Sequence, residues 1–217
     1  MDTLAAATVD EKLREIFPED DVLLKVRQDS HAVGLPIIEV SAQQGKLLEL
    51  LVRTAGAKHV LEVGTLGGYS TICLARGLPK DGNLVTLEYE FDHAKVAAEN
   101  IELAGLTDKV RILIGDAAKT LPQLFDRVKH RVQEHFDFVF IDADKDNNQL
   151  YTDWAIELTR PGATILVDNV IRDGRVLQVA NKLEYIEYLG ANPYLDVTVT
   201  QTIGEKGWDG FVLARRI

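Results

Sequence analysis

The segment Lys58 to Ser70, which reads KHVLEVGTLGGYS, decides the fold of this chain. Its first part, Lys58 to Val63, is a short apolar run typical of a buried strand, and Tyr69 to Leu78 has the apolar pattern of a helix. Three glycines stand between this strand and this helix: Gly64, Gly67 and Gly68. Glycines at such a turn let a ligand come close to backbone N–H groups, so the segment predicts a nucleotide-type binding site.

The same alternation of strands and helices continues along the chain. Strands are predicted at Asn83 to Glu88, Val110 to Ile114, Phe136 to Ile141 and Ala163 to Val167, and helices at Phe91 to Ala104, Ala117 to Val132 and Gln149 to Leu158. Because strands that are joined through helices pair in parallel, this order predicts an α/β fold with a doubly wound sheet and helices on both faces.

The two ends of the chain depart from this alternation. After a helix predicted over Val176 to Leu189, strands at Leu195 to Thr202 and Gly210 to Arg215 are expected to form an antiparallel hairpin. At the other end, Val9 to Phe17 and Asp21 to Ala32 are predicted as short amphipathic helices. Residues 1–35 are therefore expected to form a helical accessory segment.

Ser41, with Gln44 three residues later, predicts a capping box at the start of the next helix. In a capping box the serine side chain accepts the backbone N–H of the third helical residue, whose own side chain caps in return. This helix leads directly into the strand that precedes the glycine turn.

Composition limits the classes of function. With 217 residues, of which 46% are hydrophobic, the chain fits one compact domain over residues 1–217. The formal net charge of −10 disfavours a nucleic-acid surface and favours small cationic ligands or metals. A single cysteine, Cys73, excludes an internal disulfide and indicates a reducing compartment. Without a leader pattern or a run of about eighteen apolar residues, we expect a cytoplasmic protein with no membrane contact.

Acidic residues surround the glycine turn in sequence. Leu66 occupies the place of the second glycine of the dinucleotide fingerprint, which disfavours a pyrophosphate ligand. Glu62, just before the glycines, would repel phosphate but suits a positively charged amino-acid group. Glu88 ends the second predicted strand, where an acidic side chain can bind ribose hydroxyls. Asp116 and Ala117 follow the third strand, close to the expected adenine side.

Two further strands end abruptly in carboxylates. Residues 136–148 read FDFVFIDADKDNN, and residues 167–169 read VDN. Carboxylates at the ends of buried strands need a cation or solvent to receive them. Asp142, Asp168 and Asn169 supply two carboxylates and an amide oxygen, an all-oxygen set suited to Mg²⁺ or to another divalent cation such as Mn²⁺ or Ca²⁺. The sequence therefore predicts a metal site at this edge of the sheet.

Taken together, these motifs resemble those of a known enzyme family. The combination consists of Glu-Val-Gly-Thr-x-x-Gly-Tyr-Ser-Thr at residues 62–71, Ile-Asp-Ala-Asp-Lys at 141–145 and Asp-Asn at 168–169, with an acidic residue closing the second strand. It is similar to the cation-dependent S-adenosylmethionine O-methyltransferases, which include catechol and caffeoyl-CoA O-methyltransferases. The resemblance runs from about Pro36 to the C-terminus.

This resemblance implies a fold and a cofactor site. The fold would be a single methyltransferase domain with a Rossmann-like, seven-stranded, mostly parallel sheet and an antiparallel last strand, and the protein would be a homodimer. Glu88 would hold the ribose hydroxyls of S-adenosylmethionine. Because of their positions, Gly68 at the turn and Asp116 after the third strand are also expected to bind the cofactor. The residues that the resemblance itself implies are Val40, Glu62, Gly64, Thr65, Ser70, Glu88, Ala117 and Asp144.

The resemblance also implies a reaction. A divalent cation at Asp142, Asp168 and Asn169 would bind two vicinal oxygens of a phenolic acceptor and lower the pKa of one hydroxyl. Lys145 resembles the catalytic lysine that accepts the hydroxyl proton, and a neighbouring cation together with partial burial would favour its neutral form. In the alternative interpretation, Lys145 pairs with Asp144 or Asp146 on a solvated loop. The expected activity is methyl transfer from S-adenosylmethionine to a catechol-like small molecule.

Three other functions compete with this one. A caffeoyl-CoA-type enzyme would bind CoA phosphates, which the acidic balance and the few clustered N-terminal basic residues oppose. A nicotinamide-dependent oxidoreductase is opposed by Leu66 and by the otherwise unexplained oxygen ligands. A non-catalytic ligand-binding module would leave Lys145 without a role. The loop Val170 to Arg175 follows the Asp-Asn pair directly, so we expect it to border the substrate and to set specificity, with Tyr151 and Trp208 as candidate pocket residues.

Overall fold

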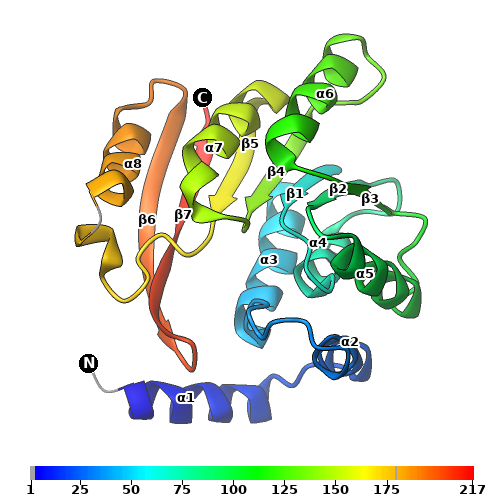
Figure 1. Ribbon diagram of the computed structural model, residues 1–217, viewed down its shortest axis with the longest axis vertical. Helices are drawn as coiled ribbons and strands as arrows, with labels where there is room; N and C mark the ends of the chain where they lie inside the picture. The colour runs from blue at the N-terminus through cyan, green and yellow to red at the C-terminus, as the bar shows by residue number, and fades with distance from the viewer. Residues whose placement is uncertain (1–2, 179) are drawn as a thin grey trace.

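A seven-stranded sheet forms the centre of the computed structural model, which describes residues 3–178 and 180–217 (Figure 1). The order of the strands across the sheet is β3-β2-β1-β4-β5-β7-β6. Strands β1 to β5 are parallel, whereas β7 runs antiparallel to both of its neighbours. The predicted Rossmann-like sheet with an antiparallel last strand is confirmed. The strands are β1 (His59–Val63), β2 (Asn83–Glu88), β3 (Val110–Ile114), β4 (Phe136–Ile141), β5 (Thr159–Val167), β6 (Leu195–Gly204) and β7 (Gly207–Arg216).

Helices cover both faces of this sheet, as predicted. One face is covered by α3 (Ala42–Ala55), α4 (Tyr69–Gly77) and α5 (Phe91–Leu103), and the other by α6 (Ala117–Lys129), α7 (Asn148–Leu158) and α8 (Ala180–Ala191).

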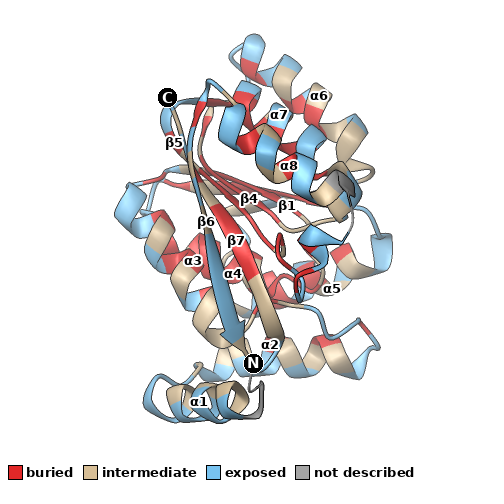
Figure 2. Cartoon of the chain, turned by 90° about the vertical axis from the view of Figure 1, so that its left-hand side faces the viewer, coloured by how far each residue is buried: buried red, intermediate tan, exposed pale blue. Residues whose placement is uncertain are grey.

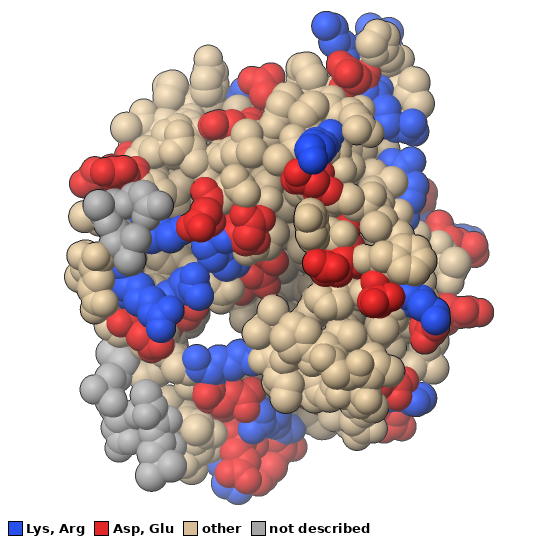
Figure 3. Space-filling view, viewed as in Figure 1, with Lys and Arg blue, Asp and Glu red and all other residues tan. Residues whose placement is uncertain are grey.

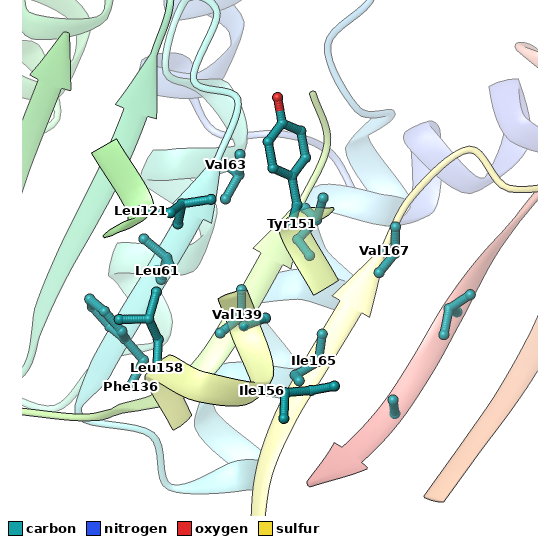
Figure 4. Packing of buried hydrophobic residues seen from close by; sticks show 14 of the residues in the cluster. Leu61, Val63, Leu121, Phe136, Val139, Tyr151, Ile156, Leu158, Ile165 and Val167 are labelled. Carbon is teal, nitrogen blue, oxygen red and sulfur yellow. The ribbon is translucent and has the colours of Figure 1, made fainter. Parts of the chain in front are cut away.

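Each face of the sheet has its own hydrophobic core, because successive strand residues point to opposite sides. In β4, Phe138 and Phe140 pack against the α3 to α5 layer, whereas Val139 and Ile141 pack against the α6 to α8 layer. Figure 4 shows part of the second core, and Figure 2 shows that central strands such as β1 and β4 are buried, whereas the edge strand β6 is largely exposed. These two cores hold the carboxyl ends of the strands in fixed positions.

The N-terminal segment forms two helices, α1 (Thr3–Ile16) and α2 (Asp21–Ala32), so α1 begins earlier than predicted. Val26 of α2 is fully buried in the core on the α4 side. The helix α1 lies at the tip of the β6–β7 hairpin, where Asp10 accepts the backbone N–H of Glu205 at 2.6 Å and Arg14 pairs with the Glu205 side chain. None of the described helices is long and apolar enough to cross a membrane.

The segment before α8 differs from the prediction. Val176 lies in a short 3₁₀ turn, Arg175–Leu177, and α8 begins only at Ala180. The backbone just before this turn is left-handed at Arg172, Asp173 and Gly174, so these three residues belong to no helix.

Strand β5 also differs, because it begins at Thr159 rather than at Ala163. The additional residues pair with β4 across a register shift between Phe136 and Phe138.

Candidate active site

A cavity of about 850 Å³ lies at the carboxyl ends of the parallel strands. This is the place where ligands bind in open α/β sheets. Figure 3 shows this face of the molecule hollowed near its centre, with charged side chains around the hollow. Most of the residues predicted for the site line the cavity: Val40, Gly64, Thr65, Ser70, Glu88, Asp116, Ala117, Asp142, Asp144, Lys145 and Asn169.

The glycine turn packs directly against the end of β4. Gly64 has a φ of 101°, and a Cβ atom added to it would lie 2.2 Å from the backbone oxygen of Asp142. A side chain at this position would therefore force the two strand ends apart. Because Gly64 has no side chain, the turn and the Asp142 carboxylate can lie side by side in one wall of the cavity.

Glu88 holds the other end of the turn. Its Oε2 accepts the backbone N–H groups of Thr65 at 3.1 Å and Leu66 at 2.7 Å, and its Oε1 accepts the N–H of Glu90 at 3.0 Å. The side chain is buried in the cavity wall. Its carboxylate therefore shapes the turn and also faces the space where a ribose would lie; the ribose contact itself stays a prediction. Asp116 caps α6 by accepting the backbone N–H of Ala118 at 2.9 Å.

Glu62 and Gly68 lie outside the lining of the cavity. Glu62 is fully buried and accepts hydrogen bonds from three hydroxyls: Ser70 at 2.6 Å, Thr71 at 2.5 Å and Thr86 at 2.7 Å. Burial raises the pKa of Glu62 to about 7, although these hydroxyls oppose the shift. Gly68 is the N-cap residue of α4, with a φ of 84°. The geometry thus gives Glu62 a role in joining β1, β2 and α4.

We expect Glu62→Gln to remove part of the pH dependence of stability. A carboxyl whose pKa is higher in the folded than in the unfolded state favours unfolding once the unfolded chain ionises. The wild-type free energy of unfolding should therefore decline between about pH 4.5 and 7, by up to roughly 3 kcal/mol from this group. Urea denaturation from pH 4.5 to 8 should show a shallower decline in the variant.

A matched control is Glu99→Gln, which makes the same chemical change at an exposed position of α5. It should keep the wild-type slope. Identical slopes in wild type and Glu62→Gln would contradict the assignment.

The predicted metal residues meet at the ends of β4 and β5. The side chain of Asp168 is almost completely buried and accepts the N–H of Asn169 at 2.8 Å and an N–H of the Gln44 amide at 2.5 Å. Burial and the nearby Asp142 carboxylate raise the pKa of Asp168 to about 7. Lys145 donates to Asp142 at 2.6 Å, and its side chain is only 13% exposed. Lys145 therefore pairs with Asp142 in a largely buried position, and not with Asp144 or Asp146 on a solvated loop.

Asn169 is oriented by Asp209, a residue of β7. Asn169 has a φ of 58°, and its Nδ2 donates to Asp209 Oδ2 at 3.1 Å. Asp209 Oδ1 accepts backbone N–H groups from Ile171 at 3.1 Å, Arg172 at 2.9 Å and Gly210 at 2.8 Å. Since Asp209 takes the nitrogen of the Asn169 amide, the amide oxygen is the atom left for a ligand.

The donor set fits a hard cation. Residues 3–178 and 180–217 contain no cluster of three or more His, Cys, Asp or Glu side chains placed to bind a metal. The candidate ligands are instead two carboxylates and one amide oxygen. Each carboxylate already accepts a hydrogen bond, Asp142 from the Lys145 ammonium and Asp168 from the neutral Gln44 amide. Oxygen ligands of this kind suit Mg²⁺, Mn²⁺ or Ca²⁺ rather than a soft metal.

Asp144 faces the cavity from the loop after β4. It accepts a hydrogen bond from the Tyr151 hydroxyl at 2.5 Å and one from the Asn147 amide at 2.5 Å. Tyr151 itself lines the cavity, as the sequence suggested for one of its two aromatic candidates. Trp208 packs beside the core of the α6 to α8 layer, and its ring nitrogen donates to Gln201.

Two residues of the site were missed in the sequence. Gln44 was assigned to a capping box, but only half of that box forms: Ser41 accepts the Gln44 N–H at 3.3 Å, while the Gln44 side chain binds Asp168. Asp209 belongs to none of the motifs in the sequence. Their partners Asp168 and Asn169 lie 124 and 40 residues away in sequence, so no local pattern could indicate these contacts.

Comparisons with known proteins show that this chain is similar to O-methyltransferases. A catechol O-methyltransferase of Mycobacterium tuberculosis is 48% identical over 202 residues, which cover 90% of this chain and 89% of the relative. A caffeoyl-CoA O-methyltransferase of Eucalyptus globulus is 32% identical over 216 residues, covering 93% and 85%. The crystal structure of an O-methyltransferase from Bacillus cereus in complex with SAH superposes with a TM-score of 0.94 at 43% identity, covering 99% of this chain and all of that one.

The family model described as O-methyltransferase matches residues 14–217, which include both strand ends with the acidic residues, the glycine turn and the C-terminal hairpin. This match covers nearly the whole chain. The chain therefore belongs to the O-methyltransferase family.

Proposed function

We propose that this enzyme transfers a methyl group from S-adenosylmethionine to one hydroxyl of a catechol-like molecule, with a divalent cation bound at Asp142, Asp168 and Asn169. The observation that carries the proposal is that Asp142 and Asn169 line the large cavity together with Lys145, while Asp168 lies buried outside the cavity lining. The catechol O-methyltransferase relative and the SAH-bound structure support the acceptor class and the methyl donor. The proposed partner is thus a small phenolic molecule.

The residues around the glycine turn would bind the methyl donor. S-adenosylmethionine supplies an electrophilic methyl group on a positively charged sulfur. Glu88 would accept hydrogen bonds from the ribose hydroxyls, since its carboxylate lies in the cavity wall beside the turn. The Asp144 carboxylate, which is held by Tyr151 and Asn147, adds negative charge on the side that a cationic donor would face.

The residues at the ends of β4 and β5 would bind and activate the acceptor. Asp142, Asp168 and Asn169 would hold a divalent cation there, which would supply Lewis-acid chemistry that lowers the pKa of an acceptor hydroxyl. Lys145 would take the hydroxyl proton at its Nζ, and Asp142 would stabilise the resulting ammonium through the contact seen at 2.6 Å. Holding the oxygen in line with the methyl carbon and sulfur supplies several kcal/mol of barrier reduction.

Metal removal tests this function directly. We expect complete chelation with EDTA to lower turnover of a 3,4-dihydroxyphenyl acceptor by at least tenfold, and added Mg²⁺ to restore it. S-adenosylmethionine binding, measured by calorimetry in the same EDTA buffer, is the control that the protein remains folded. Undiminished turnover after complete metal removal would refute the role of the cation.

A CoA thioester is the second candidate acceptor, because the chain is also similar to a caffeoyl-CoA O-methyltransferase. Side-by-side kinetics with caffeoyl-CoA and free caffeic acid separate the two classes. A higher kcat/KM for the thioester would assign the enzyme to the CoA class. The homodimer and the cytoplasmic location stay predictions from the sequence.

A further inference from the structure

A second cavity of about 160 Å³, here called the side pocket, lies beside the proposed acceptor site. It shares three lining residues with the large cavity: Lys145, Asn169 and Arg172. The rest of its polar lining comes from Asn148, Arg175, Lys182 and Tyr185. A molecule in contact with Lys145 and Asn169 in the large cavity is thus also next to the side pocket.

The side pocket is rich in positive charge, although the chain as a whole has a net charge of −10. Lys145 pairs with Asp142, and Lys182 donates to Asp146 at 2.8 Å. Figure 3 shows basic side chains gathered beside the central hollow, over the segment between β5 and α8.

Arg172 and Arg175 complete this set of charges. In the described part of the chain, neither of their guanidinium groups forms a hydrogen bond or an ion pair within contact distance. Asp146, which Arg172 influences from a distance, is already bound by Lys182. Two guanidinium groups at one pocket without a carboxylate partner are well suited to bind an anion.

The backbone that carries the two arginines is held in a costly conformation. Arg172, Asp173 and Gly174 have φ angles of 49°, 54° and 77°, so two of these three left-handed residues are not glycine. Asp209 accepts the N–H of Arg172, and the N–H of Asp173 donates to the backbone oxygen of Trp208 at 2.7 Å. Strain that is over-determined by surrounding contacts is a mark of functional segments.

A buried polar atom also faces the side pocket. Asn148 lines it, is only 5% exposed, and its Oδ1 has no hydrogen-bond partner among the described residues. Buried polar atoms are almost always paired in folded proteins, with protein groups or with ordered water. The unpaired oxygen therefore marks a polar point in the wall of the side pocket, where a hydrogen-bond donor such as water or a hydroxyl would be favoured.

We propose that the side pocket binds a small anionic group on the tail of the methyl acceptor, a carboxylate or a phosphate, and that Arg172 and Arg175 determine this specificity. The inference rests on the proposed function, since Lys145 and Asn169 form the wall between the two cavities. The aromatic ring of the acceptor lies in the large cavity, and its substituent extends between the two arginines. The preferred acceptors are thus dihydroxyphenyl acids rather than dihydroxyphenyl amines.

The test compares 3-(3,4-dihydroxyphenyl)propanoate with its neutral methyl ester. Calorimetry measures the binding of each to protein saturated with S-adenosylhomocysteine and Mg²⁺, and turnover is measured for the same pair. The acid should bind about tenfold more tightly than the ester, as expected for charge-assisted hydrogen bonds. Arg172→Gln and Arg175→Gln should each lower this preference several-fold, while ester binding stays within about twofold.

Two further variants make the test specific. Arg160→Gln removes the same charge at the opposite end of β5, where Arg160 contacts Glu134 and His135, and should keep the wild-type preference. Arg175→Lys keeps the charge without the planar fork and should retain part of the preference. Equal binding of acid and ester by the wild type, or equal loss of preference in Arg160→Gln, would overturn the inference.

The readouts separate this inference from the proposed function. Methylation of the ester without a preference for the acid overturns the side pocket and leaves the methyltransferase proposal intact. Absence of turnover with every acceptor overturns the proposed function, while calorimetry still tests the preference for the anion. Repeating the series with caffeate and caffeoyl-CoA identifies the source of the anion: a loss confined to the acid assigns a carboxylate, and a loss confined to the thioester assigns a phosphate.

Discussion

Replacing Lys145 with alanine should lower kcat by roughly 10²- to 10⁴-fold, the usual contribution of a general base. The side chain is 13% exposed, its Nζ lies 2.6 Å from Asp142, and it lines the cavity in which the acceptor would bind. The glycine turn and Glu88 do not contact Lys145, so the affinity for S-adenosylmethionine should change little. Single-turnover kinetics and calorimetry measure these two quantities separately.

Lys145→Arg is the matched control for this prediction. Arginine keeps a positive charge beside Asp142 but stays protonated, so it cannot accept a proton. If Lys145 acts only by neutralising Asp142, the arginine variant should retain most of the wild-type kcat. If it acts as a base, both variants should be slow. A wild-type kcat in Lys145→Ala would eliminate the role.

Local patterns in the sequence were sufficient to predict most of the fold. The strands Asn83–Glu88 and Phe136–Ile141 have the predicted bounds because the apolar residues of each are buried between two helical layers. The same patterns predicted the two acidic strand ends, since Asp142 and Asp168 directly follow such runs. Because β4 and β5 pair in parallel, the two carboxylates that follow them lie at the same edge of the sheet.

Contacts between distant segments could not be predicted in this way. Glu62 stands next to the glycine turn in sequence, but the hydroxyls of Ser70, Thr71 and Thr86 enclose it and take it out of the cavity wall. The left-handed backbone at Arg172 and Asp173 was not indicated by the sequence either, because neither residue is glycine.

Asp209 also makes contacts that no local sequence pattern predicts. We expect its substitution to have a large effect on stability and on metal binding. One oxygen of this carboxylate holds three backbone N–H groups of the strained loop and of β7, and the other holds the amide nitrogen of Asn169. Asp209→Ala leaves these donors without an acceptor and should lower the free energy of unfolding by about 3 kcal/mol. Urea denaturation measures this loss.

Asp209→Asn separates the two functions of the carboxylate. Its carbonyl oxygen can still accept the loop N–H groups, so the stability should fall less than in the alanine variant. Its amide nitrogen, however, would face the amide nitrogen of Asn169, and two donors cannot bind each other. Turning the Asn169 amide over relieves this conflict only by directing its nitrogen toward the cation. We therefore expect Mg²⁺ affinity, measured by calorimetry, to fall by 10- to 100-fold.

The control for that measurement is Asp92→Asn, the same substitution at an exposed position of α5. It should leave Mg²⁺ affinity unchanged. Wild-type affinity in Asp209→Asn would mean that the orientation of Asn169 does not depend on Asp209. A loss of affinity with nearly wild-type stability would instead show that a residue of the last strand, outside every motif of the sequence, sets the donor atom that Asn169 presents to the cation.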